Sequence, residues 1–146
     1  MSLLSHLHPR LKLVDPHPPD SEECIQDVVD FSPIPVPQDF IEVMREASDE
    51  QFSVEIPGED PSYFSIWGAD SCLEMNENYH VQEDLGEALA IGDNGGSEML
   101  ILIPGATPPG LYRIHMSNLD IDEASYICPS LTDLLAHADN ISNVWA

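Results

Sequence analysis

The sequence predicts an α+β domain whose sheet is mainly antiparallel. Two amphipathic helix patterns come first, short strand patterns then follow one another, and a helix pattern with its own capping signal closes the chain. Helices that are segregated from a run of consecutive strands favour this class over the alternating strand–helix order of a parallel sheet.

The start of the chain is set apart by its prolines, which fix φ and remove backbone donors. We expect residues 1–19 to form an irregular tail and residues 20–146 to form a single domain, because this length suffices for one core. The prolines of the tail are Pro9, Pro16, Pro18 and Pro19, and its histidines are His6, His8 and His17.

Two helices are expected directly after the tail. Apolar residues recur on one face of residues 21–29, where Asp20 is the predicted N-cap and Glu23 its capping-box partner. Prolines then force an extended link. The second helix spans 37–47, with Pro37 in its first turn, where the missing N–H does no harm.

Strand patterns fill the middle of the chain. Residues 52–56 alternate apolar and polar side chains, as a half-buried strand does, whereas 99–103 are continuously apolar, as expected of a central strand covered on both faces. Glycine and asparagine tolerate positive φ, so 92–96 is predicted to be a hairpin turn. Further strands are expected at 63–67, 88–91, 111–116 and 124–127, a helical segment at 73–82, and a turn at 104–110.

The closing helix begins at Ser130, and Asp133 three residues later completes a capping box. Leucines at helical spacing then face the predicted core.

The charge is the most informative feature of the composition. The chain has 27 Asp and Glu residues against 4 Lys and Arg, a formal net charge of −23. Nucleic acids and anionic membranes are recognised through Lys and Arg, so neither is expected as a partner. A basic protein is the natural complement. The alternative interpretation is that the acidity serves only solubility or a salty environment.

Three scattered cysteines, Cys24, Cys72 and Cys128, do not make the even, dense set of a disulfide scaffold. Reduced thiols fit a cytoplasmic protein. We also expect no signal peptide and no membrane span, since no run approaches about 20 apolar residues.

Signals for reaction chemistry are sparse. The single lysine, Lys12, stands in the predicted tail, and there is no phosphate-binding GxxxxGK[ST] loop and no HExxH pair. The glycine-rich stretch carries Asp93 and Glu98, which would repel a phosphate. We therefore expect no catalytic residue, cofactor or metal ion. The alternative is a metal-assisted hydrolase that uses Asp93, His115 or Asp120.

Trp67 stands at the end of a predicted strand, where a tryptophan either packs into the core or anchors a partner. The first interpretation is the more common for aromatic residues. The expected partner contacts are acids in loops and strand ends together with this tryptophan: Glu59, Asp60, Trp67, Asp70, Glu74, Glu77, Asp93 and Glu98.

Several segments together resemble the SUKH superfamily, whose domain also occurs in Smi/Knr-type regulators of cell-wall assembly. The resemblance runs from about residue 25 to residue 138 and depends on the order and spacing of its segments. They are VPQDF at 36–40, AIGDNGGSEML at 90–100, LYRI at 111–114 and PSLTDLL at 129–135. The chain departs from the family at 47–50, where ASDE replaces an Asn-Gly turn.

The resemblance implies an α+β fold with a single mostly antiparallel sheet flanked by helices, and no catalytic residues. Many bacterial members resemble immunity proteins that neutralise toxins, often nucleases. The sequence therefore leads to the hypothesis of a cytoplasmic immunity protein that inhibits a cationic toxin through an acidic face. A regulatory adaptor or scaffold of the same fold is the main alternative.

Overall fold

The structure is a computed structural model and describes residues 3–145. Within these residues, seven strands form one antiparallel sheet whose spatial order follows the sequence, β1 to β7. The predicted α+β class with a single mostly antiparallel sheet flanked by helices is confirmed. The strands are β1 (Leu11–Val14), β2 (Glu50–Val54), β3 (Ser62–Ile66), β4 (Leu89–Asp93), β5 (Glu98–Ile103), β6 (Gly110–His115) and β7 (Ser125–Cys128).

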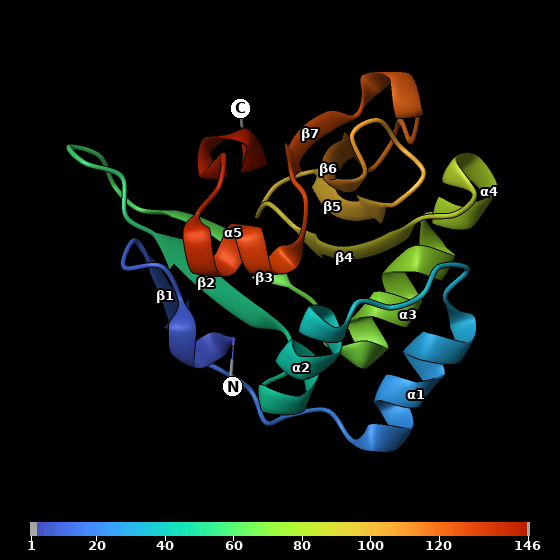
Figure 1. The fold of residues 1–146 in the computed structure, drawn as a ribbon, viewed down its shortest axis with the longest axis horizontal. Coiled ribbons are helices and arrows are strands. Elements are labelled where there is room, and N and C mark those ends of the chain that lie inside the picture. The colour runs from blue at the N-terminus through green and yellow to red at the C-terminus, as the bar shows by residue number, and fades with distance from the viewer. Residues whose placement is uncertain (1–2, 146) are drawn as a thin grey trace.

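The helices are inserted between strands and after the last one. Figure 1 shows α1, α3 and α4 gathered at one side of the sheet, with α5 lying across its front. Helix α1 packs on both α2 and α3, and α2 packs on α5. The α-helices of the described residues are α1 (Glu22–Phe31), α2 (Gln38–Glu46), α3 (Ala69–Asn78), α4 (Val81–Leu85) and α5 (Leu131–His137); short 3₁₀ helices are η1 (Leu4–His6), η2 (Ile121–Glu123) and η3 (Ile141–Val144).

The hydrophobic core lies between the sheet and the helices. Phe52 on β2 and Phe64 on β3 are direct cross-strand partners, fully buried, with ring centroids 5.1 Å apart. Trp145 packs edge-on against Phe64. Strand β5 is buried on both faces from Met99 to Ile103, as its continuous apolar run predicted.

The prediction that residues 1–19 form an irregular tail is wrong for much of this segment. Strand β1 pairs with β2, with Leu11 opposite Val54, and η1 precedes it. The N–H of His8 also donates to the carbonyl of Leu135 on α5. Pro9 and Pro16 bracket a proline-free stretch in which Leu11 and Leu13 alternate with Lys12, and a four-residue edge strand fits inside it.

The caps of the first helices differ from the prediction. Ser21, not Asp20, caps α1, because its Oγ accepts from the N–H of Cys24. Asp20 instead accepts from the N–H of Ala69 at 2.8 Å, in the first turn of α3. The helical segment predicted at 73–82 is two helices, α3 and α4, separated at His80, whose φ is +54°.

The predicted cap of the closing helix is confirmed, and the hairpin turn predicted at 92–96 is found one to two residues further along the chain. Strands β4 and β5 form a hairpin through residues 94–97, with Gly95 at φ +81°. Gly92 belongs to β4, where a Cβ atom would come within 2.2 Å of the Ser65 carbonyl oxygen. Ser130 caps α5 by accepting from the N–H of Asp133 at 3.1 Å.

Candidate functional site

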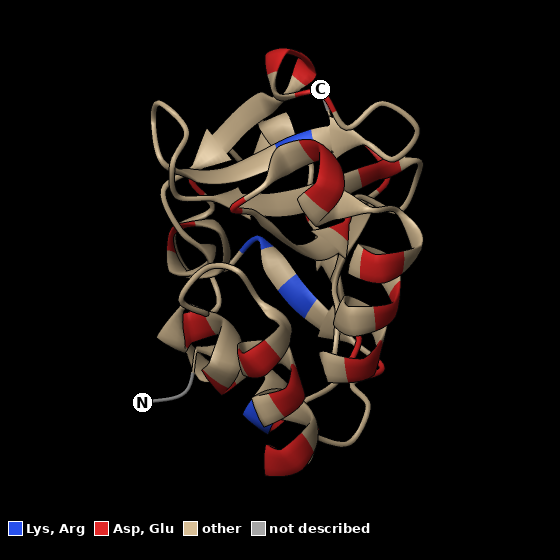
Figure 2. Ribbon diagram, turned by 90° about the vertical axis from the view of Figure 1, so that its right-hand side faces the viewer, with Lys and Arg blue, Asp and Glu red and all other residues tan. Residues whose placement is uncertain are grey.

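A strongly acidic surface is formed by two helices, α1 and α3, that lie side by side. Their outward side chains include seven exposed carboxylates, and Figure 2 shows acids distributed along the helices of this side. We call this surface the acidic face: it consists of Glu22, Glu23, Asp27 and Asp30 on α1 and Asp70, Glu74 and Glu77 on α3.

The amphipathic pattern of each helix places these carboxylates outward. Helix α1 buries Ile25 and Val28, and α3 buries Ala69, Cys72 and Asn76. Residues three and four positions apart share a helix face, so burying one stripe turns the intervening acids to solvent. Hydration there avoids the large free-energy cost of an unpaired buried charge.

Helix α3 is held at its N-terminus by carboxylates from elsewhere in the chain. Gly68, its N-cap, has no side chain to cap the helix, and its own N–H donates to Asp49 Oδ1 at 2.7 Å. Asp20 accepts from the next N–H, that of Ala69. These negative groups complement the positive end of the helix dipole.

Only one cation pairs with the acidic face within residues 3–145. Arg45 on α2 lies 2.9 Å from Glu22 on α1, and the hydrogen bond to that carboxylate raises the pKa of the guanidinium. The ion pair joins the two helices at one end of the face and leaves six of its seven carboxylates without a Lys or Arg partner.

The structure brings together only part of the predicted contact set. Asp70, Glu74 and Glu77 lie together on α3, whereas Glu59 and Asp60 are exposed in the β2–β3 loop at the opposite side of the molecule in Figure 1. The acids of α1 were missing from that set, although helical spacing already placed them on the outer face of that helix.

Trp67 is not an exposed aromatic residue. It is 5% exposed, and its indole Nε1 donates to Asp93 at 2.8 Å. Asp93 also accepts from the N–H of Gly95, and Glu98 pairs with Arg113 at 3.1 Å and accepts from Asn94. These three residues are thus engaged inside the fold and lie outside the acidic face.

Glu50 at the start of β2 is the one acid whose side chain is fully buried, among the 27 that the structure describes. Neither carboxyl oxygen has a hydrogen-bond partner. Burial, and to a smaller extent the nearby charges of Asp20, Asp49 and Glu46, raise the pKa of Glu50 to about 8. The side chain is therefore mainly protonated and neutral at pH 7.

A serine–histidine contact at the β5–β6 edge has the geometry of a structural hydrogen bond. The backbone N–H of Ser117 donates to Nδ1 of His115 at 3.1 Å, so the proton of the neutral ring resides on Nε2. Nε2 lies 3.0 Å from Ser97 Oγ and donates to it. A general base needs the opposite direction, accepting the hydroxyl proton.

The residues of the hydrolase alternative do not converge. Asp93 bonds to Trp67, His115 bonds to two serines, and Asp120 accepts from Asp122 N at 2.9 Å as the cap of η2. Among residues 3–145 there is no group of three His, Cys, Asp or Glu side chains that could hold a metal ion.

The three thiols are free. Burial raises the pKa of both Cys72 and Cys128 to about 12, so neither is an activated nucleophile at neutral pH. None of the helices in the described part of the chain has the length and hydropathy needed to cross a membrane.

No protein-family model and no curated protein sequence matches the chain.

Proposed function

We propose that this protein is a non-enzymatic protein-binding domain that docks a cationic partner on its acidic face. The observation that supports this most directly is the set of exposed carboxylates on α1 and α3, of which only Glu22 has an arginine partner. Because both helices are packed on the sheet or on each other, the charges form a preorganised surface.

Charge complementarity acts on this surface before contact is made. A field of one sign steers an oppositely charged protein toward it and raises the association rate. At about 0.1–0.15 M salt this field is largely screened at distances beyond about 8–10 Å.

The partner in this proposal is a toxin domain of the nuclease type, and the protein is its cytoplasmic immunity protein. A nuclease must hold a polyanion and is therefore cationic around its site. An acidic face can occupy the same surface and exclude the substrate. The SUKH-like order of segments described above supports the same assignment, and the free thiols are consistent with a reducing compartment.

Affinity capture with the intact protein, followed by binding kinetics on the captured partner, tests the proposal. We expect a basic partner whose association rate falls steeply between low and physiological salt. The variant D70N/E74Q/E77Q should bind it at least roughly tenfold more weakly.

The matched control is D120N/D122N/E123Q, which removes three exposed acids from η2, outside the acidic face. It should bind like the wild type. Equal loss in both variants would reduce the effect to overall charge, and a neutral or acidic partner bound without salt dependence would refute the proposal. Several endogenous partners without a toxin would identify an adaptor instead.

A further inference from the structure

Two of the four cations are unpaired in a chain that offers 27 carboxylates. Arg45 pairs with Glu22 and Arg113 pairs with Glu98. Arg10 and Lys12 make no ion pair with any residue of the described chain. Both stand at the β1 edge, beside the β2–β3 loop.

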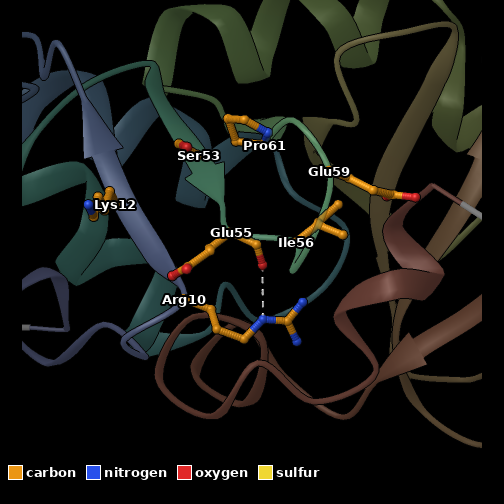
Figure 3. A pocket seen from close by; sticks show the side chains of 7 residues that line it. All are labelled: Arg10, Lys12, Ser53, Glu55, Ile56, Glu59 and Pro61. Carbon is orange, nitrogen blue, oxygen red and sulfur yellow. Dashed lines mark hydrogen bonds between the residues drawn. The ribbon is translucent and has the colours of Figure 1, made fainter.

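Arg10 is half-buried and uses only one nitrogen of its guanidinium in a hydrogen bond with a described residue. Its Nε donates to the backbone carbonyl of Glu55 at 3.1 Å, which fixes the side chain and leaves the two Nη groups without a partner. Figure 3 shows the guanidinium below Ile56, with the carboxylates of Glu55 and Glu59 pointing away from it. Lys12 lies at the far end of this hollow, which measures about 250 Å³.

A second hollow of about 320 Å³ shares Arg10, Ile56 and Glu59 with the first and is the more apolar of the two. We call it the Arg10 pocket. Its apolar lining is Val54, Ile56, Ile141 and Trp145, and its further polar lining is the hydroxyls of Ser62 and Ser142, neither of which bonds to a described residue.

The tryptophan wall of the Arg10 pocket is held in place by contacts with the sheet and the β4–β5 turn. The indole Nε1 of Trp145 donates to the carbonyls of Tyr63 at 3.1 Å and Asn94 at 3.0 Å, and its ring packs against Phe64. The pocket thus combines an anchored aromatic side chain with a guanidinium and two serines whose hydroxyls have unused donors. An apolar cavity with a few convergent polar groups is the usual form of a small-molecule site.

We propose that the Arg10 pocket binds a small organic acid, one carboxylate attached to an apolar group about the size of a phenyl ring. The planar guanidinium can donate paired hydrogen bonds to the two oxygens of a carboxylate, and the apolar group would cover Ile56, Ile141 and Trp145. The volume lies at the lower end for ligand pockets, which fits a single ring. This site is separate from the acidic face and does not depend on the function proposed above.

Titration of the intact protein with 3-phenylpropionate, followed by ¹H–¹⁵N NMR, tests the inference. The chain has two tryptophans, so the indole signal of Trp145 reports the pocket and that of buried Trp67 is an internal reference. We expect a saturable shift of the Trp145 signal at millimolar ligand, and little or none with 3-phenylpropanol, which lacks the carboxylate.

Substitutions of Arg10 and Lys12 test whether binding requires the guanidinium of Arg10 or only a positive charge nearby. R10Q should weaken binding at least about tenfold, and R10K, which keeps the charge without the planar fork, should be intermediate. K12Q removes the neighbouring unpaired cation, which lines only the first hollow, and should bind nearly as the wild type does. An unchanged Trp67 signal shows that each variant is folded.

Phenylalanine as a second ligand tests whether the pocket binds an amino acid or a simple carboxylic acid. Its ammonium group can meet Glu59 at the rim, so tighter binding than 3-phenylpropionate, lost in E59Q, would assign the pocket to an amino acid. Weaker binding would assign it to a simple acid. No saturable shift with either ligand, or equal affinity for the alcohol or for R10Q, would overturn the inference.

Discussion

Glu50 lies where the alternation of β2 turns side chains inward. Glu50, Phe52 and Val54 share one face of the strand, and all three are fully buried. Burial favours the protonated form of a carboxyl group in this position, because no cation of the described chain lies close enough to pair with it. Proton binding at Glu50 is therefore coupled to folding.

The first prediction concerns the pH dependence of stability. Between pH 4.5, the ordinary pKa of a glutamate, and about pH 8, folded Glu50 holds a proton that the unfolded chain releases. The free energy of unfolding should therefore fall as the pH rises through this window, by up to about 1.4 kcal/mol per unit from this group. Above about pH 8 both states are ionised and this contribution becomes constant.

Denaturant unfolding of the wild type and E50Q across pH 5–9 isolates the effect, since the other acids are common to both. The difference in unfolding free energy should shift in favour of E50Q as the pH rises. E55Q, which changes an exposed acid just beyond the same strand, should follow the wild type. A parallel course for wild type and E50Q would show that Glu50 has an ordinary pKa.

The burial of Glu50 could have been predicted from the sequence, whereas the contact of Asp20 with Ala69 could not. The alternation at 52–56 has the same parity as position 50, so extending the strand by two residues places Glu50 inside. Asp20 was assigned to the helix that follows it, because capping signals are read locally. Its actual partner, Ala69, is 49 positions away, and no local pattern encodes that contact.

At the scale of elements, Asn76 joins α3 to β4. Its Nδ2 donates to the Ala90 carbonyl at 2.9 Å and its Oδ1 accepts from the Ala90 N–H at 3.0 Å. Strand β3 pairs with β4 only at Ser65 and Ile66. The side chain of Asn76 therefore supplies hydrogen bonds to the backbone of Ala90, which lies beyond the end of that pairing. A fully buried amide thus completes the sheet.

The second prediction is that N76A lowers the free energy of unfolding by at least about 2 kcal/mol, because it leaves the buried N–H of Ala90 unpaired and its carbonyl with only the weak thiol donor of Cys72. Chemical denaturation measures the loss. N78A changes an exposed asparagine two residues further along α3 and should stay within about 0.5 kcal/mol of the wild type. Similar values for the two variants would contradict the role given to Asn76.

Elements with their own local signals were predictable, and those held by distant contacts were not. The capping box of Ser130 and Asp133 correctly predicted α5, and the apolar run at 99–103 correctly predicted β5. Strand β1 is short and flanked by prolines, and it is a strand only because β2 offers it a partner. The Arg10 pocket escaped prediction for the same reason, since its walls come from β2, its loop and η3.

At the scale of the whole molecule, the net charge of −23 is distributed over a surface with few compensating cations. Nineteen of the 27 acids are exposed, and among residues 3–145 only Glu22 and Glu98 form ion pairs with Lys or Arg. Mutual repulsion of these charges opposes the compact state, and it is weakened when salt shortens the screening length.

The third prediction is that the melting temperature rises as sodium chloride increases from about 0.01 M to about 0.15 M, where the screening length falls from about 30 Å to about 8 Å. Thermal unfolding followed by circular dichroism measures it. E74Q/E77Q, with two fewer charges on the acidic face, should show a smaller rise. A melting temperature that is constant or falls with salt would mean that repulsion is not a significant term.

Every strand of the sheet pairs with the strand that precedes it in the chain. During synthesis each strand therefore emerges from the ribosome after the strand with which it pairs. The sheet can therefore grow in the direction of synthesis, without waiting for a distant segment. Helix α5 is the exception: it binds the backbone of His8 through Leu135 and the side chain of Asp39 through Thr132. Translation of α5 thus adds the contact that holds the segment before β1, and a chain halted before this helix would keep the pairing of β1 with β2 but lack that contact.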